Sequence, residues 1–203
     1  MGKELIRTGW VTKKDLFILM GMVVLSFIIE NTLGLILLVT GIPLAGGLIS
    51  AVFDAALIFL GIFLVPRKLA AFFFAFGLLL FSVITPSFGP PGFYKLLIGI
   101  MLGGITEIFL VFLGRKAWAY IVTVAIVFGL SIPITYFAWL LCGIPNLETL
   151  KKQMLWLIPA YVFLGAVGAS IGATVYYKTL SKFRLIRDLR TIDNSEQAPS
   201  TEE

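Results

Sequence analysis

Long runs of apolar residues alternate along this chain with short polar connections. Most of these runs approach the roughly 20 residues that a helix needs to span the hydrocarbon core of a membrane. Only a few residues, including adjacent basic pairs, separate the second run from the third and the fourth run from the fifth. The pattern predicts an all-α membrane protein with six transmembrane helices, at about residues 16–29, 48–65, 69–85, 94–113, 117–141 and 154–177.

The first run is short unless the sequence NTLGLILLVTG, which follows Glu30, is counted with it. We expect that sequence to belong to a first outer loop, 31–47, that lies at membrane depth. Such a loop must be buried in protein, because lipid cannot hydrogen-bond to irregular backbone. The other outer connections, 86–93 and 142–153, are also rich in Gly and Pro, and a ligand would arrive on this side.

Composition supports the membrane assignment. Of the 203 residues, 59% are hydrophobic and only 13% are charged, and the mean hydropathy is +1.02. Soluble domains carry roughly 25% charged residues. The chain therefore has too few charges to cover a surface that faces water.

The basic residues predict the orientation. Thirteen of the sixteen Lys and Arg residues fall before the first run, after the sixth, or in the two short connections on the same side. By the positive-inside rule, both termini are cytoplasmic in a multi-pass protein of the plasma or inner cell membrane. The net charge of +5 is thus a signal of topology, and we expect contacts with lipid and none with nucleic acid.

The six-helix domain at 14–177 is flanked by a cytoplasmic segment, 1–13, and by two C-terminal segments. Residues 178–190 repeat apolar side chains at a spacing of three, which predicts an amphipathic extension of the last helix. Residues 191–203 are polar and acidic and are typical of a disordered tail.

Missing residue types exclude several kinds of chemistry. The chain has no histidine and one cysteine, Cys142, so it lacks Ser-His and Cys-His nucleophile pairs, His-ligated metals and CxxC sites. It also has no Walker A motif, so a partner would have to hydrolyse any ATP. We expect no catalytic residue, no metal site and no cofactor, and we rank an enzyme last among the function classes.

Three acids lie in or beside apolar runs: Glu30, Asp54 and Glu107. A charge at the centre of a bilayer costs about 2.5–3.5 kcal/mol on insertion scales, so such residues usually face a cavity or a partner. One interpretation is a common pocket for a cationic or donor-rich solute. The alternatives are an interfacial cap at Glu30 and structural hydrogen bonds at Asp54 and Glu107.

Aromatic and amide side chains border the outer loops and could complete such a pocket by stacking on a flat ring or holding a cation. The alternative is the ordinary aromatic belt at the membrane surface. The sequence FGPPGFYK, 88–95, predicts a rigid outer turn that serves as a gate or pocket wall or as a plain turn. The candidate binding residues, besides the three acids, are Asn31, Tyr94, Lys95, Tyr136, Trp139, Asn146 and Trp156.

Small residues form two stripes on the sixth run, and such stripes let membrane helices pack closely. We expect one stripe to pack within the chain and to leave the other for a partner protein. The residues of this candidate interface are Gly165, Gly168, Ala169, Gly172 and Ala173.

The helix count, the cytoplasmic termini, the first outer loop and the sequence GPPGFYK before LLIGIMLGG resemble the substrate-binding S component of an energy-coupling factor (ECF) transporter. The resemblance covers about residues 14–177. It implies a binder of a vitamin or vitamin precursor that docks on a membrane coupling subunit driven by two ATPase subunits, and topples to carry its pocket inward. The alanine-spaced motif of the family's first helix is missing from 16–29, so the stripes of the sixth run are the candidate coupling surface.

Acids together with aromatics favour a cationic heteroaromatic ligand, such as a thiamine-like or pyrimidine compound, although riboflavin, biotin or a pterin-like compound would suit the same residue types. Two other function classes stay open. One is an autonomous proton- or cation-coupled carrier or channel with Asp54 and Glu107 as its relay. The other is a structural membrane protein without a ligand.

Overall fold

The computed structural model describes residues 10–40, 45–86, 89–114, 116–144 and 147–180. This part of the chain is helical and contains no β-strand, which confirms the predicted all-α class. Four of the helices are long and apolar enough to cross a membrane, which is consistent with a multi-pass membrane protein. The helices are α1 Lys13–Thr40, α2 Ala45–Leu64, α3 Ala70–Ser82, α4 Tyr94–Leu113, α5 Ala117–Leu141 and α6 Leu147–Lys178.

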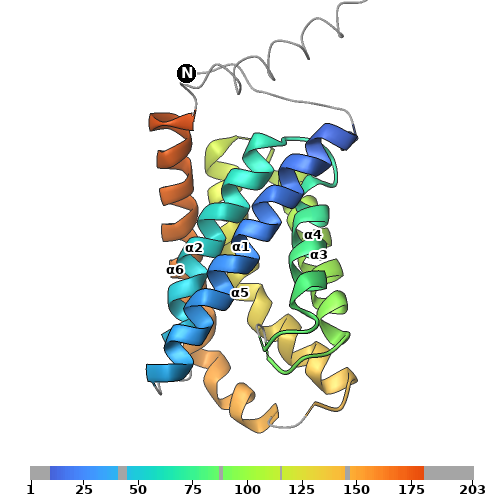
Figure 1. Ribbon diagram of the computed structural model, residues 1–203, viewed down its shortest axis with the longest axis vertical. Helices are drawn as coiled ribbons and strands as arrows, with labels where there is room; N and C mark the ends of the chain where they lie inside the picture. Colours follow the sequence, from blue (N-terminus) through green and yellow to red (C-terminus); the bar gives the residue numbers. More distant parts are fainter. Residues whose placement is uncertain (1–9, 41–44, 87–88, 115, 145–146, 181–203) are drawn as a thin grey trace, which may run out of the picture.

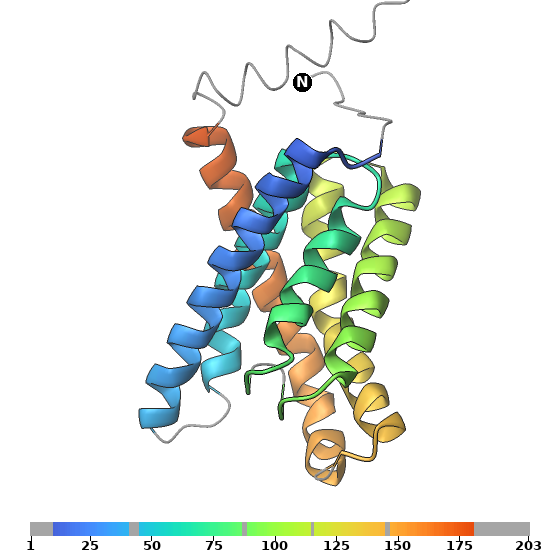
Figure 2. The same ribbon diagram turned by 45° about the vertical axis from the view of Figure 1, so that its right-hand side comes forward.

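The six helices form a closed ring. Around it, α1 packs on α3, α3 on α4, α4 on α5, α5 on α6, α6 on α2, and α2 on α1 (Figure 1, Figure 2). Helix α2 also contacts α3 and α5, so it touches four other helices and lies closer to the centre of the bundle than a helix that contacts only two. Every helix therefore has one face toward a shared interior.

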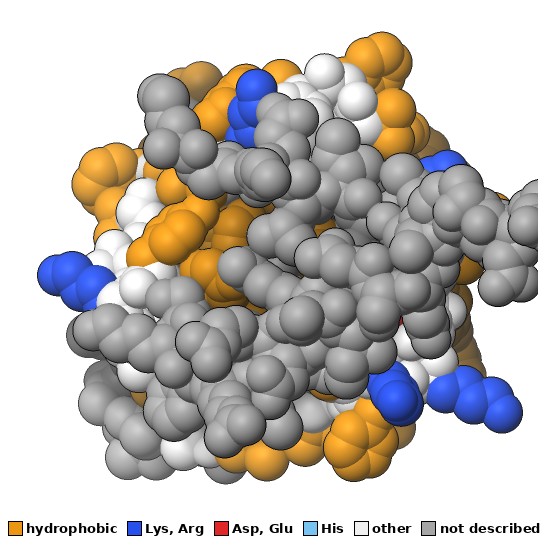
Figure 3. All heavy atoms as spheres, turned by 90° about the horizontal axis from the view of Figure 1, so that it is seen from above, with side chains coloured by type: hydrophobic (Ala, Val, Ile, Leu, Met, Phe, Trp, Pro, Cys, Tyr) orange, Lys and Arg blue, Asp and Glu red, His pale blue; other side chains and the backbone are white. Residues whose placement is uncertain are grey.

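The two ends of the bundle differ in charge. The start of α1, the turn between α2 and α3, the start of α5 and the end of α6 meet at the upper end in Figure 1. Figure 3 looks down on this end and shows basic side chains around its rim. Among the described residues, the basic ones at this end are Lys13, Lys14, Arg67, Lys68, Lys116 and Lys178, whereas Lys95, Lys151 and Lys152 belong to the other half. The structure thus separates the charges as the sequence predicts, and the side of the membrane that each end faces stays a prediction.

The predicted first outer loop needs correction. Helix α1 continues without interruption to Thr40, and α2 begins at Ala45, so only residues 41–44 of the expected loop fall outside described helix. The Asn31 amide donates to the Phe27 carbonyl at 2.8 Å, and the Thr32 hydroxyl donates to the Ile28 carbonyl at 2.7 Å. The helix itself therefore satisfies the polar side chains that suggested a loop, and the leucines that follow favour helix.

The other connections differ less from expectation. Helices α4 and α5 coincide with the predicted runs, while α3 is shorter than its run. Helix α6 begins at Leu147, seven residues before the predicted start at 154, and so takes up much of the expected third outer connection.

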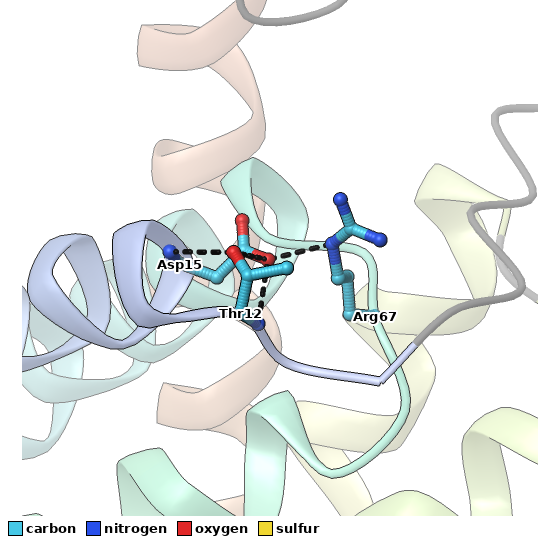
Figure 4. Close-up of polar contacts among 3 residues, drawn as sticks. All are labelled: Thr12, Asp15 and Arg67. Carbon is cyan, nitrogen blue, oxygen red and sulfur yellow. Dashed lines mark hydrogen bonds and ion pairs between the residues drawn. The ribbon is translucent and has the colours of Figure 1, made fainter. Parts of the chain in front are cut away.

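A polar clamp fixes α1 at the basic end (Figure 4). The Thr12 hydroxyl and backbone N–H both donate to Asp15 Oδ2, at 2.7 and 3.0 Å, and the Asp15 N–H donates back to the Thr12 hydroxyl at 3.3 Å. This reciprocal arrangement is a capping box. Arg67 Nε, in the turn between α2 and α3, lies 2.6 Å from the same carboxylate oxygen, so the start of α1 is tied to its two neighbours.

Candidate binding cavity

A cavity lies inside the ring, and all six helices contribute to its lining. Its volume is about 140 Å³. The sequence does not fill this space with side chains, because several positions that face it carry small residues, among them Ala51, Ala71 and Ala75. The cavity is therefore the natural place to look for a site.

One wall of the cavity is polar, and it comes from the three neighbouring helices α1, α2 and α6. Glu30 of α1 and Asp54 of α2 line it, with exposed fractions of 8% and 4%, together with Ser50 and Tyr161. The Ser26 hydroxyl, on α1, donates to Asp54 Oδ1 at 2.9 Å. The contact between α1 and α2 thus brings two acids, 24 positions apart in the sequence, to one wall.

The opposite wall comes from α3, α4 and α5, and it is apolar. Two hydroxyl residues lie there, but both donate to their own helix: Thr106 to the Leu102 carbonyl and Ser131 to the Phe128 carbonyl, each at 2.6 Å. The remaining residues of this wall are Ala71, Phe74, Ala75, Leu78, Leu79, Leu102, Val124, Val127 and Phe128. A ligand would therefore meet acids on one side and hydrocarbon on the other.

The acids have unequal surroundings. Lys95 of α4 lies within electrostatic reach of the Glu30 carboxylate. Among the residues that the structure describes, no Lys or Arg forms an ion pair with Asp54, whose carboxylate accepts a hydrogen bond from the neutral Ser26 hydroxyl. A buried carboxylate is costly unless a cation or several hydrogen bonds compensate it. Asp54 is thus suited to accept a cationic group from the cavity.

The structure places the third acid elsewhere. Glu107 does not line the cavity, and its Oε1 accepts the Ala71 N–H at 2.8 Å. The first N–H groups of a helix have no partner within the helix, so this carboxylate caps α3 from the neighbouring α4. This contact corresponds to the structural alternative for Glu107, and we leave Glu107 out of the candidate site.

The described part of the predicted turn, 89–95, is held by hydrogen bonds within the turn and to the end of α3. Lys95 is fully buried, and its ammonium group donates to the Ser82 and Thr85 carbonyls at 2.9 and 2.6 Å, at the end of α3. The Tyr94 hydroxyl donates to the Pro90 carbonyl at 2.6 Å. Neither side chain lines the cavity, so the turn closes the end of the α3–α4 pair and does not supply a pocket wall.

Trp139 of α5 packs against the same turn. Its ring stands edge-on to Tyr94 with ring centroids 6.4 Å apart, and a Cβ atom at Gly89 would collide with the indole. Gly89 also has a φ of 102°, a conformation that favours glycine. The aromatic pair and Gly89 therefore serve packing at the end of the bundle opposite to the basic rim.

The other predicted binding residues do not line the cavity either. Asn31 is bonded to its own helix, Tyr136 is half-buried, and Trp156 is 44% exposed. Asn146 lies outside the described residues. Sequence reasoning thus found Glu30 and Asp54 and missed Ser50 and Tyr161. Ser50 could have been found, because it precedes Asp54 by four positions and so shares its helix face.

The small-residue stripes of α6 also need correction. All five residues are buried inside the bundle. A Cβ atom at Gly165 would approach Phe128 and Ala125 of α5, and one at Gly168 would collide with the Val52 carbonyl of α2. Both stripes are therefore occupied by helices of the same chain, and neither is left for a partner protein.

Among the described residues, no group of three or more Cys, Asp or Glu side chains could hold a metal ion.

No family model, no curated protein and no solved structure matches the chain.

Proposed function

We propose that this chain is a membrane-embedded binding subunit for a small organic molecule, and that it serves the uptake of a vitamin or vitamin precursor in the manner of an ECF S component. One observation carries the proposal: the ring of six helices encloses a cavity with two buried acids on one wall and hydrocarbon on the other. Ligand sites in proteins usually combine an apolar lining with a few converging polar groups.

A purely structural bundle accounts for this arrangement less well. Interiors are normally packed with few voids, and an acid inside a membrane protein is costly and usually marks a functional site. Here the acids and the void coincide, and all six helices contribute to the same space. A bound ligand would both fill the void and compensate the acids.

In the proposed transport system, this chain would bind and partner subunits would couple transport to ATP hydrolysis. Because both small-residue stripes of α6 are buried, the coupling surface would lie on exposed helix faces instead. The chain would then tilt or open as a whole to release its ligand, as the family resemblance implies.

A second candidate function, an autonomous proton- or cation-coupled carrier, is favoured by the position of Glu30 and Asp54 on one wall of the cavity. The relay that the sequence suggested paired Asp54 with Glu107. Since Glu107 caps α3, Glu30 would take its place.

Mass spectrometry of small molecules released from the purified full-length protein tests the proposal. The comparison is with Asp54→Asn, which keeps the side-chain shape, and with Glu148→Gln, which makes the same chemical change at an exposed position in the first turn of α6. We expect a stoichiometric organic compound in the parent and in Glu148→Gln, and its loss from Asp54→Asn.

An empty parent protein that stays empty after soaking in a vitamin mixture would contradict the binding-subunit proposal. The second candidate would then be tested by proton flux into liposomes that contain this chain alone. It predicts flux in the parent that is lost in Asp54→Asn and in Glu30→Gln.

A further inference from the structure

We propose that the ligand of the cavity is a compact organic monocation: an amine that carries one apolar group no larger than a single six-membered ring. The inference rests on the proposed function, because it names the ligand class of the same site. It excludes two-ring and three-ring compounds and neutral or anionic ligands.

The charge follows from the buried groups. Three ionisable groups lie in this part of the interior: the acids Glu30 and Asp54, and Lys95, which interacts with Glu30. Glu30 has Lys95 within electrostatic reach, whereas Asp54 has no described cation beside it, so a bound cation would be the group that holds Asp54 in its charged form. One positive charge on the ligand balances the Asp54 carboxylate, whereas a dication would leave an excess charge in an apolar interior, where the cost is highest.

The size follows from the cavity volume. The cavity holds about 140 Å³. A dry cavity of about 150 Å³ in another protein is known to bind benzene. One ring or a branched alkyl group of the same size therefore fits, while a flavin or pterin ring system would require the helices to move apart.

The orientation follows from the two walls. The polar wall is confined to α1, α2 and α6, and the apolar wall to α3, α4 and α5. The ammonium group would lie against Asp54 with the oxygens of Ser50 and Tyr161 nearby, and the ring would lie against the aromatic and aliphatic side chains of α3 and α5.

Three probes separate charge from size. Benzylamine is a one-ring monocation, benzyl alcohol is its neutral counterpart, and 1-naphthylmethylamine carries the same charge on two rings. Binding is measured by calorimetry on the full-length protein in lipid nanodiscs, with empty nanodiscs as the control for partition into lipid.

We expect the affinity for benzylamine to be at least about tenfold higher than that for benzyl alcohol. A hydrogen bond to a charged group contributes more binding free energy than a hydrogen bond between neutral groups. We expect no saturable binding of 1-naphthylmethylamine. In Asp54→Asn the preference for benzylamine over benzyl alcohol should disappear, and in Glu148→Gln it should persist.

Equal affinity for benzylamine and benzyl alcohol in the parent protein, or saturable binding of the two-ring amine, would overturn the inference. Both comparisons use the parent protein, so they hold even if Asp54→Asn fails to fold. Ala75→Leu offers a second variant: it fills the cavity without changing its charge and should abolish benzylamine binding.

The inference and the proposed function fail in different ways. A neutral, anionic or multi-ring compound released from the purified protein would contradict the monocation inference but agree with the proposed binding subunit. The absence of any saturable binding, by probes and by the vitamin mixture alike, would reject both.

Discussion

At the residue scale, the contact between Ser26 and Asp54 joins α1 to α2 within the apolar bundle. Removal of the hydroxyl in Ser26→Ala takes this hydrogen bond away from the Asp54 carboxylate. Hydrogen bonds between membrane helices average about 0.6 kcal/mol, and bonds to charged groups in proteins reach about 1.5–3 kcal/mol. We expect Ser26→Ala to lower the free energy of unfolding by about 0.6–2 kcal/mol, measured by SDS titration of the protein in mixed micelles.

The double variant Ser26→Ala, Asp54→Asn is the control for this prediction. If the hydroxyl acts through the carboxylate, its removal should cost less once Asp54 has become an amide, because the partner is no longer charged. Additive losses in the double variant would mean that Ser26 contributes through packing alone.

A second residue, Lys95, is fully buried, and its amino group donates to the Ser82 and Thr85 carbonyls at and just beyond the end of α3. Lys95→Met keeps the length and the apolar part of the side chain and removes the donor. We expect a loss of about 1–3 kcal/mol, because two buried carbonyls lose their partner. Amide hydrogen exchange should rise in residues 82–92 and stay unchanged in α6, whereas a uniform rise along the chain would contradict a local role.

At the element scale, α6 lies so close to α2 that glycine is required at the crossing. A Cβ atom at Gly168 would collide with the Val52 carbonyl, which cannot move without shifting α2. We expect Gly168→Ala to lower the stability by about 1–3 kcal/mol, as overpacking does in protein interiors. Thermal unfolding in detergent, followed by tryptophan fluorescence, measures the shift in Tm.

Gly104 provides the matched control for the Gly168 substitution. It lies on α4, and a Cβ atom there would have no heavy atom within 4 Å. Since alanine favours helix over glycine by about 1 kcal/mol, Gly104→Ala should keep or slightly raise Tm. A similar loss in both variants would show that the close contact between α2 and α6 is not the cause.

Helix α3 depends on a residue from another element. Glu107 of α4 accepts the Ala71 N–H, and the residue before α3, Leu69, has a φ of 66° and makes no side-chain cap bond. Glu107→Ala should cost about 0.5–2 kcal/mol, the usual price of a lost cap, and Glu107→Gln should cost less because an amide oxygen still accepts. Both variants should keep the ligand affinity of the parent in calorimetry, and a selective loss of binding would return Glu107 to the site.

How far the sequence predicted each element depended on local signals. The bounds of α4 and α5 were predictable, because Pro, Gly and basic residues flank uniform apolar runs there. The continuation of α1 past Glu30 was not, because Asn31 and Thr32 resemble loop residues until their bonds to the preceding helical turn are known. Glu30 and Asp54 could be found as costly acids, but what separates them from Glu107 is a contact to α3 that no local pattern encodes.

At the scale of the whole molecule, the closed ring explains why a cavity exists at all. Six helices around one centre cannot all touch, and the contacts of α2 with α3 and α5 close only part of the interior. The acids belong to helices on one arc of the ring, and the hydrocarbon wall comes from the arc of α3, α4 and α5, so the boundary between the two walls follows the boundary between the two arcs.

The orientation of the whole protein in the membrane can be tested with Cys142, the only cysteine of the chain. Cys142 is exposed and follows α5, at the end opposite to the basic rim. The positive-inside rule predicts that this end faces away from the cytoplasm. A membrane-impermeant maleimide should therefore label Cys142 in intact cells that express the protein. In the Cys142→Ala background, Lys14→Cys at the start of α1 should react only after the membrane is permeabilised. Cys142→Ala alone should stay unlabelled. If Lys14→Cys instead reacted in intact cells and Cys142 did not, the predicted topology would be wrong, and the end of the bundle that carries Cys142 would face the cytoplasm.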